Sequence, residues 1–434
     1  MKIDKNNYAV EPRVFLCGKE STVTVRPIGK EAAFETGVRY RVELIPEEIT
    51  ASSWMIKEAA KDTLLLTPEE GSLRFRYTFC GEQEWTISVR RDEEGTDVCL
   101  TTSVYSLEED LYVRTPYRGD CHSHSCCSDG RDTPALVAAN YRRAGYDFMA
   151  LTDHSRWAPS DNMIRQYEGV PIDIRLFHGE EVHFRKSRIH IVNFGGARSV
   201  NEMIIGNEDA YEEQFRREGE ALKGTLPVEV DATEYAARKW IYEQIHACGG
   251  LAIFAHPCWM MNTRQYNVPH NMSEAVLRTG IYDAMELVTG QSVQENNVQQ
   301  ALYHEMRAQG LKIPVVGDSD SHGTENFKRY FAWAQTIVFA KDCEFESLCE
   351  GIRSLYSAAI EREATTGELR VHGPLRLVRY GNFLLQYYFP HHNDLCLEEG
   401  LQMQNYILGE PGAKEALARL HGRTAAYAAR FFGR

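Results

Sequence analysis

The chain has 434 residues, of which 43% are hydrophobic and 25% are charged, and its formal net charge is −14. This composition is typical of a globular protein long enough for two domains, and the acidic balance argues against binding to long nucleic acid. The sequence contains no apolar run of membrane-spanning length and no signal-peptide pattern, so we expect a cytoplasmic protein with no membrane partner.

Residues 1–112 are predicted to form an all-β, sandwich-like domain. Segments such as STVTVRP, RYRVELIP and EWTISVR are rich in β-branched and aromatic residues, and charged turns such as RDEEGTD separate them. Because this part of the chain lacks a cluster of His, Asp or Glu residues, we expect it to contribute no metal ligand.

Residues 113–371 show short apolar runs that alternate with helical stretches. The runs YDFMALTDH, LAIFAHP and KIPVVGDSDSH end in polar residues, and TPALVAANYRRAG begins with Thr133 as a helix N-cap and Pro134 at the first helical position. Such alternation predicts a parallel sheet, and polar residues at the carboxyl ends of strands are typical of a TIM-like barrel. The segment provides about seven strands, one fewer than the standard barrel.

Two further segments flank or interrupt this pattern. A polar insertion near residues 197–231 is predicted to form a cap or lid over the barrel mouth. Residues 372–434 are predicted to form a C-terminal β/α extension, since PLRLVRYGNFLLQYYFP has a strand-like pattern and GAKEALARLHGRTAAYAARFF a helical one. The Ala/Phe stripe of the last helix predicts docking on the body of the protein or on a second copy, which leaves a homo-oligomer open.

The ends of the apolar runs carry a set of candidate metal ligands. In HSHSCCSDG, two histidines one residue apart project from the same face of an extended backbone. With the polar residues that follow later runs, the set comprises His122, His124, Asp129, His154, Glu181, His190, His256, Asp320 and His322. Zinc takes about four ligands and manganese or iron about six, so we expect about two to three divalent transition-metal ions with bridging carboxylates.

Each of these residues also has a purely structural explanation when taken alone. The occurrence of all nine at one end of one alternating α/β segment favours the metal site. Glu181 is preferred as the inward carboxylate, with Glu180 as the alternative, and Asp153 either orients a ligand ring or only binds backbone. The neighbouring cysteines are not needed as ligands.

The motifs HSHSCCSDG, LTDH, GEEV, IHIV, FAHP and SDSH resemble, in this order, the successive motifs of the PHP family, named for polymerases and histidinol phosphatases. The resemblance covers roughly residues 115–340 and implies a distorted seven-stranded barrel, up to three metal ions and phosphoesterase activity. The lead-in LYVRTPYRGD and the added β domain look closest to a carbaryl-hydrolase-like branch, whose members cleave varied esters.

The resemblance also implies how the ligands are shared among the ions. One ion would be held by His122, His124, Glu181 and Asp320, and a second by Glu181, His190 and His256, with Glu181 bridging the two. The third would be held by Asp129, His154 and His322. Glu181 and Asp320 are accordingly the predicted catalytic carboxylates.

Three further residues are candidates for handling the substrate. Arg156 follows the TDHS loop and Arg264 follows AHPCW, and a guanidinium group binds phosphate through two parallel hydrogen bonds. His183, two residues after Glu181, is a candidate general acid for the leaving group.

The leading hypothesis is a metal-dependent hydrolase in which a metal-activated hydroxide attacks a small phosphate mono- or diester. Hydrolysis of a carboxylic ester, amide or carbamate at the same site is the first alternative. A non-catalytic, metal-stabilised binding module is the second, but its signature would be the loss of ligands, and the sequence retains all nine.

Overall fold

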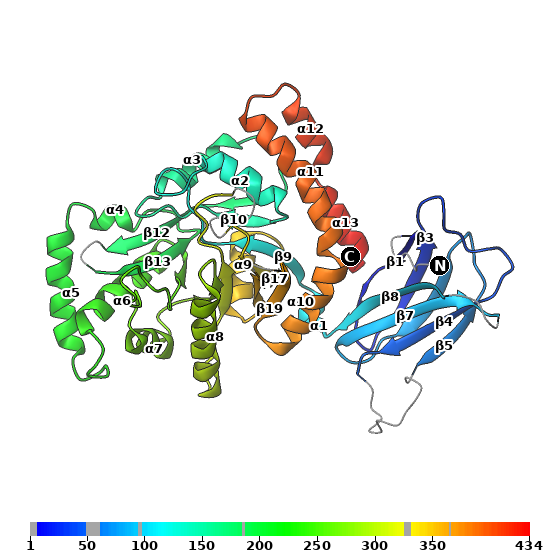
Figure 1. The fold of residues 1–434 in the computed structure, drawn as a ribbon, viewed down its shortest axis with the longest axis horizontal. Coiled ribbons are helices and arrows are strands. Elements are labelled where there is room, and N and C mark those ends of the chain that lie inside the picture. Colours follow the sequence, from blue (N-terminus) through cyan, green and yellow to red (C-terminus); the bar gives the residue numbers. More distant parts are fainter. Residues whose placement is uncertain (1–6, 49–60, 94–97, 185–186, 325–330, 364–365) are drawn as a thin grey trace. The chain divides into compact units, whose positions relative to one another are not determined.

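The computed structural model describes residues 7–48, 61–93, 98–184, 187–324, 331–363 and 366–434 (Figure 1). The chain divides into two compact units. Unit 1 comprises residues 1–114, 379–392 and 422–434, and unit 2 comprises residues 115–378 and 393–421. None of the helices in these described ranges combines the length and apolar character needed to cross a membrane.

Unit 1 contains two sheets. The first has the order β1 (Tyr8–Glu11), β3 (Glu20–Pro27) and β6 (Leu73–Thr78), and the second has the order β2 (Val14–Leu16), β8 (Val98–Leu107), β7 (Gln83–Arg91), β4 (Tyr40–Pro46) and β5 (Asp62–Leu66). Residues alternate between buried and half-buried along β7, and the buried Trp85, Ile87 and Val89 share a core with Val23 and Leu73 of the other sheet. Two sheets that bury one face each against a common core explain the alternation seen in the sequence.

The extension after residue 372 is helical rather than β/α, which corrects the prediction. It consists of α10 (Leu375–Tyr387), α11 (Phe389–Ile407), α12 (Ala413–Leu420) and α13 (Arg423–Phe432). In α10 the buried residues Leu377, Tyr380, Phe383 and Leu384 recur at intervals of three, three and one, which is a helical period. The Val and Tyr residues at the start of this segment suggested a strand, but burial on a single helix face determines the structure.

Unit 2 contains the remaining strands in two further sheets. One has the order β11 (Arg175–Phe177), β10 (Phe148–Ala150), β9 (Thr115–Asp120), β17 (Ala334–Ala340), β18 (Ser357–Arg362) and β19 (Leu369–His372). The other has the order β12 (Gly179–Phe184), β13 (Ile189–Phe194), β14 (Leu251–Phe254), β15 (Ala284–Thr289) and β16 (Val315–Asp318). Neighbours β9, β10 and β11 pair in parallel, as do β14, β15 and β16.

Helices connect these strands, so the mixed α/β class predicted from the sequence is present. They are α2 (Pro134–Arg143), α3 (Ala158–Gln166), α6 (Ala232–Ala247), α7 (His270–Thr279), α8 (Val293–Ala308) and α9 (Phe345–Arg353), and α1 (Glu109–Tyr112) precedes β9. Thr133 is the N-cap residue of α2 and Pro134 its first residue, as the sequence predicted.

The described strands of unit 2 form a half-barrel of two open sheets and not a closed seven-stranded ring. The described strands of unit 2 number eleven, β9 to β19, where about seven were predicted. The single run IRLFHGEE, for example, comprises two strands, because the chain leaves one sheet at the end of β11 and enters the other at Gly179. Short apolar runs show that strands exist but not which strands pair, and pairing decides whether a sheet closes.

Two seams join the sheets of the half-barrel. At one, Gly317 N–H of β16 donates to Thr336 Oγ1 of β17 at 2.9 Å, and that hydroxyl lies 2.9 Å from Gly317 O. A Cβ atom at Gly317 would meet a backbone oxygen at 2.5 Å, so only glycine fits there. At the other seam, an isolated parallel bridge joins His154 to Glu181.

The predicted insertion contains two helices, α4 (Asn201–Ile204) and α5 (Glu208–Leu222). Tyr211 and Phe215 of α5 pack on Trp240 of α6, with ring centroids 4.7 Å and 5.7 Å apart. Phe215 also packs on Phe184 of β12 at 5.3 Å. The insertion is therefore docked on the outer side of the strand that carries Glu181, and its action as a lid stays a prediction.

A buried arginine holds part of α11 against the rest of unit 2. Arg142 of α2 has no exposed surface, and its Nε and Nη2 atoms lie 2.8 Å and 2.7 Å from Glu399 Oε2 of α11. Its Nη1 donates to Tyr146 O at 3.0 Å. A buried charge of this kind is stable only while its partners remain.

We expect the substitution Arg142→Met to lower the free energy of unfolding by about 3–5 kcal/mol, because it leaves the buried Glu399 carboxylate without its cation. Urea or thermal unfolding followed by circular dichroism measures this loss. The adjacent, exposed Arg143 is the matched control, and Arg143→Met is expected to change the free energy by no more than about 0.5 kcal/mol. Equal effects of the two substitutions would contradict the structural role of Arg142.

Candidate metal centre

All nine predicted ligands lie together in unit 2, most of them just beyond the ends of strands. His122 and His124 follow β9, His154 follows β10, His256 follows β14, and Asp320 follows β16. Their ligand atoms fall into four overlapping groups within 4.8 Å: His124, Asp129, His154 and His322; His154, Glu181, His183 and His190; His122, Glu181 and His256; His122, His124 and Asp320. The structure thus adds one residue, His183, to the predicted set.

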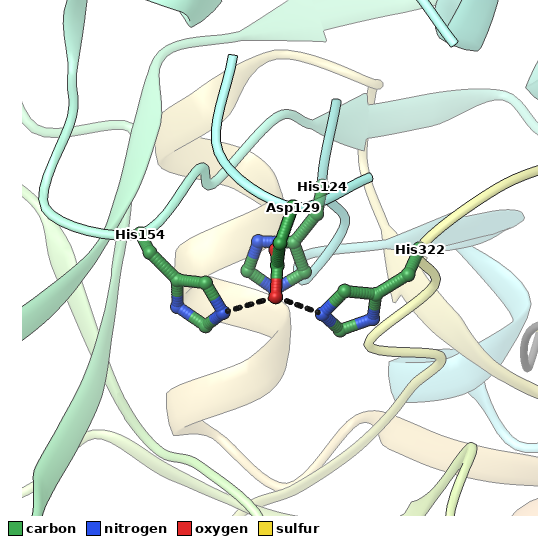
Figure 2. A group of neighbouring side chains, drawn as sticks. All are labelled: His124, Asp129, His154 and His322. Atoms are coloured by element: carbon green, nitrogen blue, oxygen red, sulfur yellow. Dashed lines mark ion pairs between the residues drawn. The ribbon is translucent and has the colours of Figure 1, made fainter. Parts of the chain in front are cut away.

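Asp129 lies between two histidine side chains at the open side of the centre (Figure 2). Its Oδ2 is 3.4 Å from His154 Nε2 and 3.3 Å from His322 Nε2, and the His124 ring lies beside both, with centroids 4.3 Å and 4.4 Å away. Burial alone would raise the pKa of Asp129, but hydrogen bonds from the two histidines hold it well below its usual range.

Glu181 is the most central carboxylate. It is fully buried, and six histidines surround its two oxygens. Oε1 lies 2.8 Å from His190 Nδ1 and 3.1 Å from His256 Nε2. Oε2 lies 2.5 Å from His154 Nδ1, 3.2 Å from His183 Nε2, 3.6 Å from His122 Nε2 and 3.8 Å from His124 Nε2. These histidines come from different segments, so one carboxylate connects most of the site.

Glu180 faces the opposite side of β12, because adjacent strand residues point in opposite directions. It is also fully buried, but its partners belong to the start of the insertion and to β13. Its oxygens accept hydrogen bonds from Ser199 Oγ at 2.7 Å, Val200 N at 2.5 Å and Asn193 Nδ2 at 3.2 Å. The structure therefore directs Glu181, and not Glu180, toward the histidines.

Asp320 completes the inner part of the centre. Its Oδ1 lies 2.9 Å from His124 Nε2 and 3.4 Å from His122 Nε2, and Gln291 Nε2 donates to its Oδ2 at 3.1 Å. Burial would raise the pKa of Asp320, but the neighbouring histidines hold it well below its usual range. The backbone of Asp320 has a φ of +51°, a strained value that is common at functional sites.

The same negative charge acts on the histidines. Burial acts to lower the pKa of His154, but the carboxylates of Glu181 and Asp129 raise it to about 10. Burial likewise acts to lower the pKa of His122, and Asp320, Glu286 and Glu181 raise it well above its ordinary value. Burial dominates instead at His124 and His190 and lowers the pKa of each to about 4, so the histidines of the centre differ in how readily they take up a proton. Protons and metal ions compete for the same imidazole nitrogens.

Several buried atoms at the centre have no hydrogen-bond partner. They are the ring nitrogens His122 Nε2, His124 Nδ1 and His256 Nδ1. Buried polar atoms are nearly always satisfied, so each such atom needs an explanation. Imidazole nitrogens and carboxylate oxygens are the ligands that zinc, manganese and iron accept, so the residues present fit a multi-metal site.

A cavity of about 600 Å³ opens onto the centre. Six of the predicted ligands line it: Asp129, His154, His190, His256, Asp320 and His322. Trp259 and Gln291, which the sequence did not identify, also line it. The Trp259 ring packs against those of His190 and His256, at 5.6 Å and 5.4 Å. Trp259 is three residues beyond His256 and Gln291 is two beyond β15, so position after a strand was the available signal for both.

The predicted substrate-binding arginines lie elsewhere. Arg156 and Arg264 are both exposed, and neither lines the cavity. Within the described ranges, the residues that line the cavity include no lysine or arginine. The structure does not bring these two guanidinium groups to the centre.

His183, the predicted general acid, lies behind His154 rather than at the cavity wall. Its Nε2 is 2.8 Å from His154 Nδ1, and it is absent from the residues that line the cavity. Asp153 binds the loop after His124, accepting from Ser125 N at 2.9 Å and Ser125 Oγ at 2.7 Å. Asp153 therefore binds backbone, as in the second explanation given for it from the sequence. These hydrogen bonds fix the loop that leads to Asp129.

We expect Glu181→Gln to remove most of the bound metal and to lower turnover at least ~10²-fold, because the substitution deletes the charge that six histidines share. Elemental analysis of purified protein measures the metal content. Glu180→Gln is the matched control: it is expected to keep the metal and to lose about 1–3 kcal/mol of stability, since it weakens the contacts at the start of the insertion. Loss of metal in the control and retention in Glu181→Gln would reverse the assignment.

No protein-family model and no curated protein matches the chain. Among solved structures, the chain is similar to a two-domain protein containing a predicted PHP-like metal-dependent phosphoesterase from Bacteroides vulgatus, with 17% identity and a TM-score of 0.40; the match covers 57% of this chain and 65% of that one, less than two thirds of its length. It is also similar to a protein named for a metal-dependent phosphoesterase from Bifidobacterium adolescentis (18% identity, TM-score 0.34, 48% of this chain and 88% of that one). A third is an amidohydrolase from Chromobacterium violaceum with bound sulfate and no metal (18% identity, TM-score 0.31, 47% of this chain and 87% of that one). With likenesses this distant, the chemistry of the site is inferred from its own residues.

Proposed function

We propose that this protein is a metal-dependent hydrolase that cleaves a small phosphate mono- or diester. The observation that carries the proposal is the fully buried carboxylate of Glu181, which six histidines surround beside a cavity of about 600 Å³. A structural role alone would not require so many imidazoles around one charge, nor an opening to solvent beside them. Concentrated ligands next to an accessible cavity are typical of a catalytic site.

The nine predicted residues would hold about two to three divalent ions, which polarise an ester oxygen and lower the pKa of bound water. Glu181 and Asp320 offset the positive charge, and both are buried, so their charges act in a region of low dielectric constant. Gln291 donates a hydrogen bond to Oδ2 of Asp320, and Oδ1 of the same carboxylate lies beside the ring of His124.

The substrate contacts come from the cavity wall. Trp259 offers an aromatic surface for an apolar part of the substrate, and Gln291 offers an amide for a polar part. The volume of the cavity suits a small molecule. His183 supports Glu181 and His154 from behind, and its part as a general acid remains a prediction.

One observation favours a second candidate, hydrolysis of a carboxylic ester, amide or carbamate. Phosphate sites commonly include arginine or lysine, and the described lining of this cavity contains neither. A neutral ester needs no such cation. The phosphoester remains the first proposal, because the metal ions themselves can neutralise a phosphate.

We expect purified protein to contain about two to three transition-metal ions per chain, and chelation to abolish hydrolysis that added Zn²⁺ or Mn²⁺ restores. Elemental analysis and an assay with a chromogenic aryl phosphate test this. Fewer than about one ion per chain, with no gain on reconstitution, would refute the proposal. An aryl carboxylic ester assayed in parallel separates the two candidate substrate classes.

We expect Trp259→Ala to raise KM for an aryl substrate roughly 2- to 10-fold with a smaller change in kcat, since aromatic contacts contribute about 0.5–1.5 kcal/mol and act mainly on binding. Arg156→Ala is the control and is expected to leave KM unchanged within about 2-fold, because Arg156 is exposed and away from the cavity. A larger KM effect for Arg156→Ala than for Trp259→Ala would restore the sequence-based prediction for this arginine.

A further inference from the structure

A carboxylate that the sequence did not identify lies directly beneath the metal centre. Glu286 is in the middle of β15, within the apolar run AMELVT, and has no exposed surface. Its neighbours Met285 and Leu287 belong to a hydrophobic core on the other side of the strand. A charged group in such a position is costly unless both of its oxygens have partners.

Both oxygens of Glu286 bind segments that carry candidate metal ligands. Oε1 lies 2.7 Å from His122 Nδ1, and Oε2 accepts a hydrogen bond from His256 N at 2.6 Å. His122 follows β9 of one sheet and His256 follows β14 of the other. A single carboxylate therefore fixes the relative positions of two ligand segments that approach from different sheets.

The contact with His122 also determines which of its ring nitrogens faces the rest of the site. The Glu286 carboxylate beside Nδ1 accepts the N–H of that nitrogen, so Nε2 is the nitrogen that can give up its proton to bind an ion. This Nε2 is one of the buried atoms without a hydrogen-bond partner, and it lies 3.4 Å from Asp320 Oδ1 and 3.6 Å from Glu181 Oε2. It is thus directed at the two innermost carboxylates.

We propose that Glu286 is a positioning residue that sets the tautomer and ring orientation of His122, and the path of the chain at His256, for metal binding. The proposal rests on the proposed metal centre and assigns Glu286 no direct contact with an ion or with substrate. Carboxylates that hold a ligand histidine by its second nitrogen strengthen metal binding in many proteins.

The structure also indicates that the fold does not depend on this carboxylate alone. Gln299 of α8 donates to the backbone oxygen of Glu286 at 2.7 Å and accepts from Cys258 N at 3.2 Å. This amide ties β15 to the loop after β14 independently of the Glu286 side chain. A substitution at the carboxylate can therefore change the ligands without unfolding the region.

The test is the affinity of metal-free protein for Zn²⁺ or Mn²⁺, measured by competition with a chromophoric chelator. In Glu286→Gln, the amide keeps the shape but has one acceptor for two donors, so either His122 or the His256 backbone loses its partner. We expect the affinity to fall about 10- to 100-fold, with metal-free protein that still folds and unfolds cooperatively after losing about 1–3 kcal/mol of stability, as in Glu180→Gln.

A matched control is available in Glu361 of β18, a buried carboxylate whose Oε2 lies 3.1 Å from the ring of His372, which belongs to none of the metal-ligand groups. Glu361→Gln makes the same chemical change to a Glu–His pair and is expected to leave metal affinity unchanged. Glu286→Gln in a His122→Ala background is expected to cost less affinity than in wild type, because its main target is already gone.

The outcomes separate this inference from the proposed function. Wild-type protein that binds no metal would overturn both. Wild-type protein that binds metal, with Glu286→Gln binding equally well, would overturn only the role of Glu286. If Glu286→Gln does not fold, Glu286→Asp decides, because it keeps the charge but is too short to reach both partners; an affinity equal to wild type would again overturn the proposal.

Discussion

The burial of the Glu181 carboxylate among imidazoles is the contact on which the rest of unit 2 depends. A charge without exposed surface is stable only where donors or cations surround it, and here the donors come from segments far apart in the sequence. His190 belongs to the neighbouring strand, whereas His122, His154 and His256 follow three other strands. The order of the strands must bring the ends that precede these histidines together around Glu181. The buried charge is therefore stable only in this topology of the half-barrel.

Side chains alternate between the two faces of β12, so its two adjacent glutamates have different roles. Glu181 faces the histidines, and Glu180 faces the start of the insertion. Asn201 connects the two, because its Nδ2 lies 3.1 Å from both Glu180 Oε2 and Glu181 O, and its Oδ1 accepts from His183 N at 3.0 Å. The start of the insertion is thus fixed to the strand that carries Glu181, as α5 is through the packing of Phe215 on Phe184.

The sequence predicted the site better than the fold, and the reason is physical. Ligand types at the ends of apolar runs are local features, and all nine predicted residues meet in one place. Closure of a sheet depends on which strands pair, and apolar runs do not encode that choice.

The helix α10 was missed because its helical period was hidden by residues that also suit strands. Glu286 was missed because ligands were sought at strand ends, although a carboxylate inside a buried apolar run is itself a signal. Arg156 is exposed and does not line the cavity, because nearness in sequence to a ligand does not aim a side chain at it, and its role in substrate binding stays a prediction.

The position of the centre at a seam between sheets gives metal binding a second consequence. Beside the histidines, the segments after β10 and in β12 are joined by an isolated bridge at His154 and Glu181, in which Glu181 N donates to Thr152 O and Ser155 N donates to Glu181 O, each at 3.0 Å. A second isolated bridge links Ser123 to Ser321, between the two segments that hold the HSH and DSH motifs. Ions held from both sides would close this seam where backbone hydrogen bonds are few. The free energy of metal binding would then contribute to the stability of the half-barrel itself, since ligands that bind the folded state stabilise it by mass action. Without metal, the inward carboxylates are offset by histidines whose pKa they raise, such as His122 and His154, so an ion that closes the seam must also displace protons from these rings.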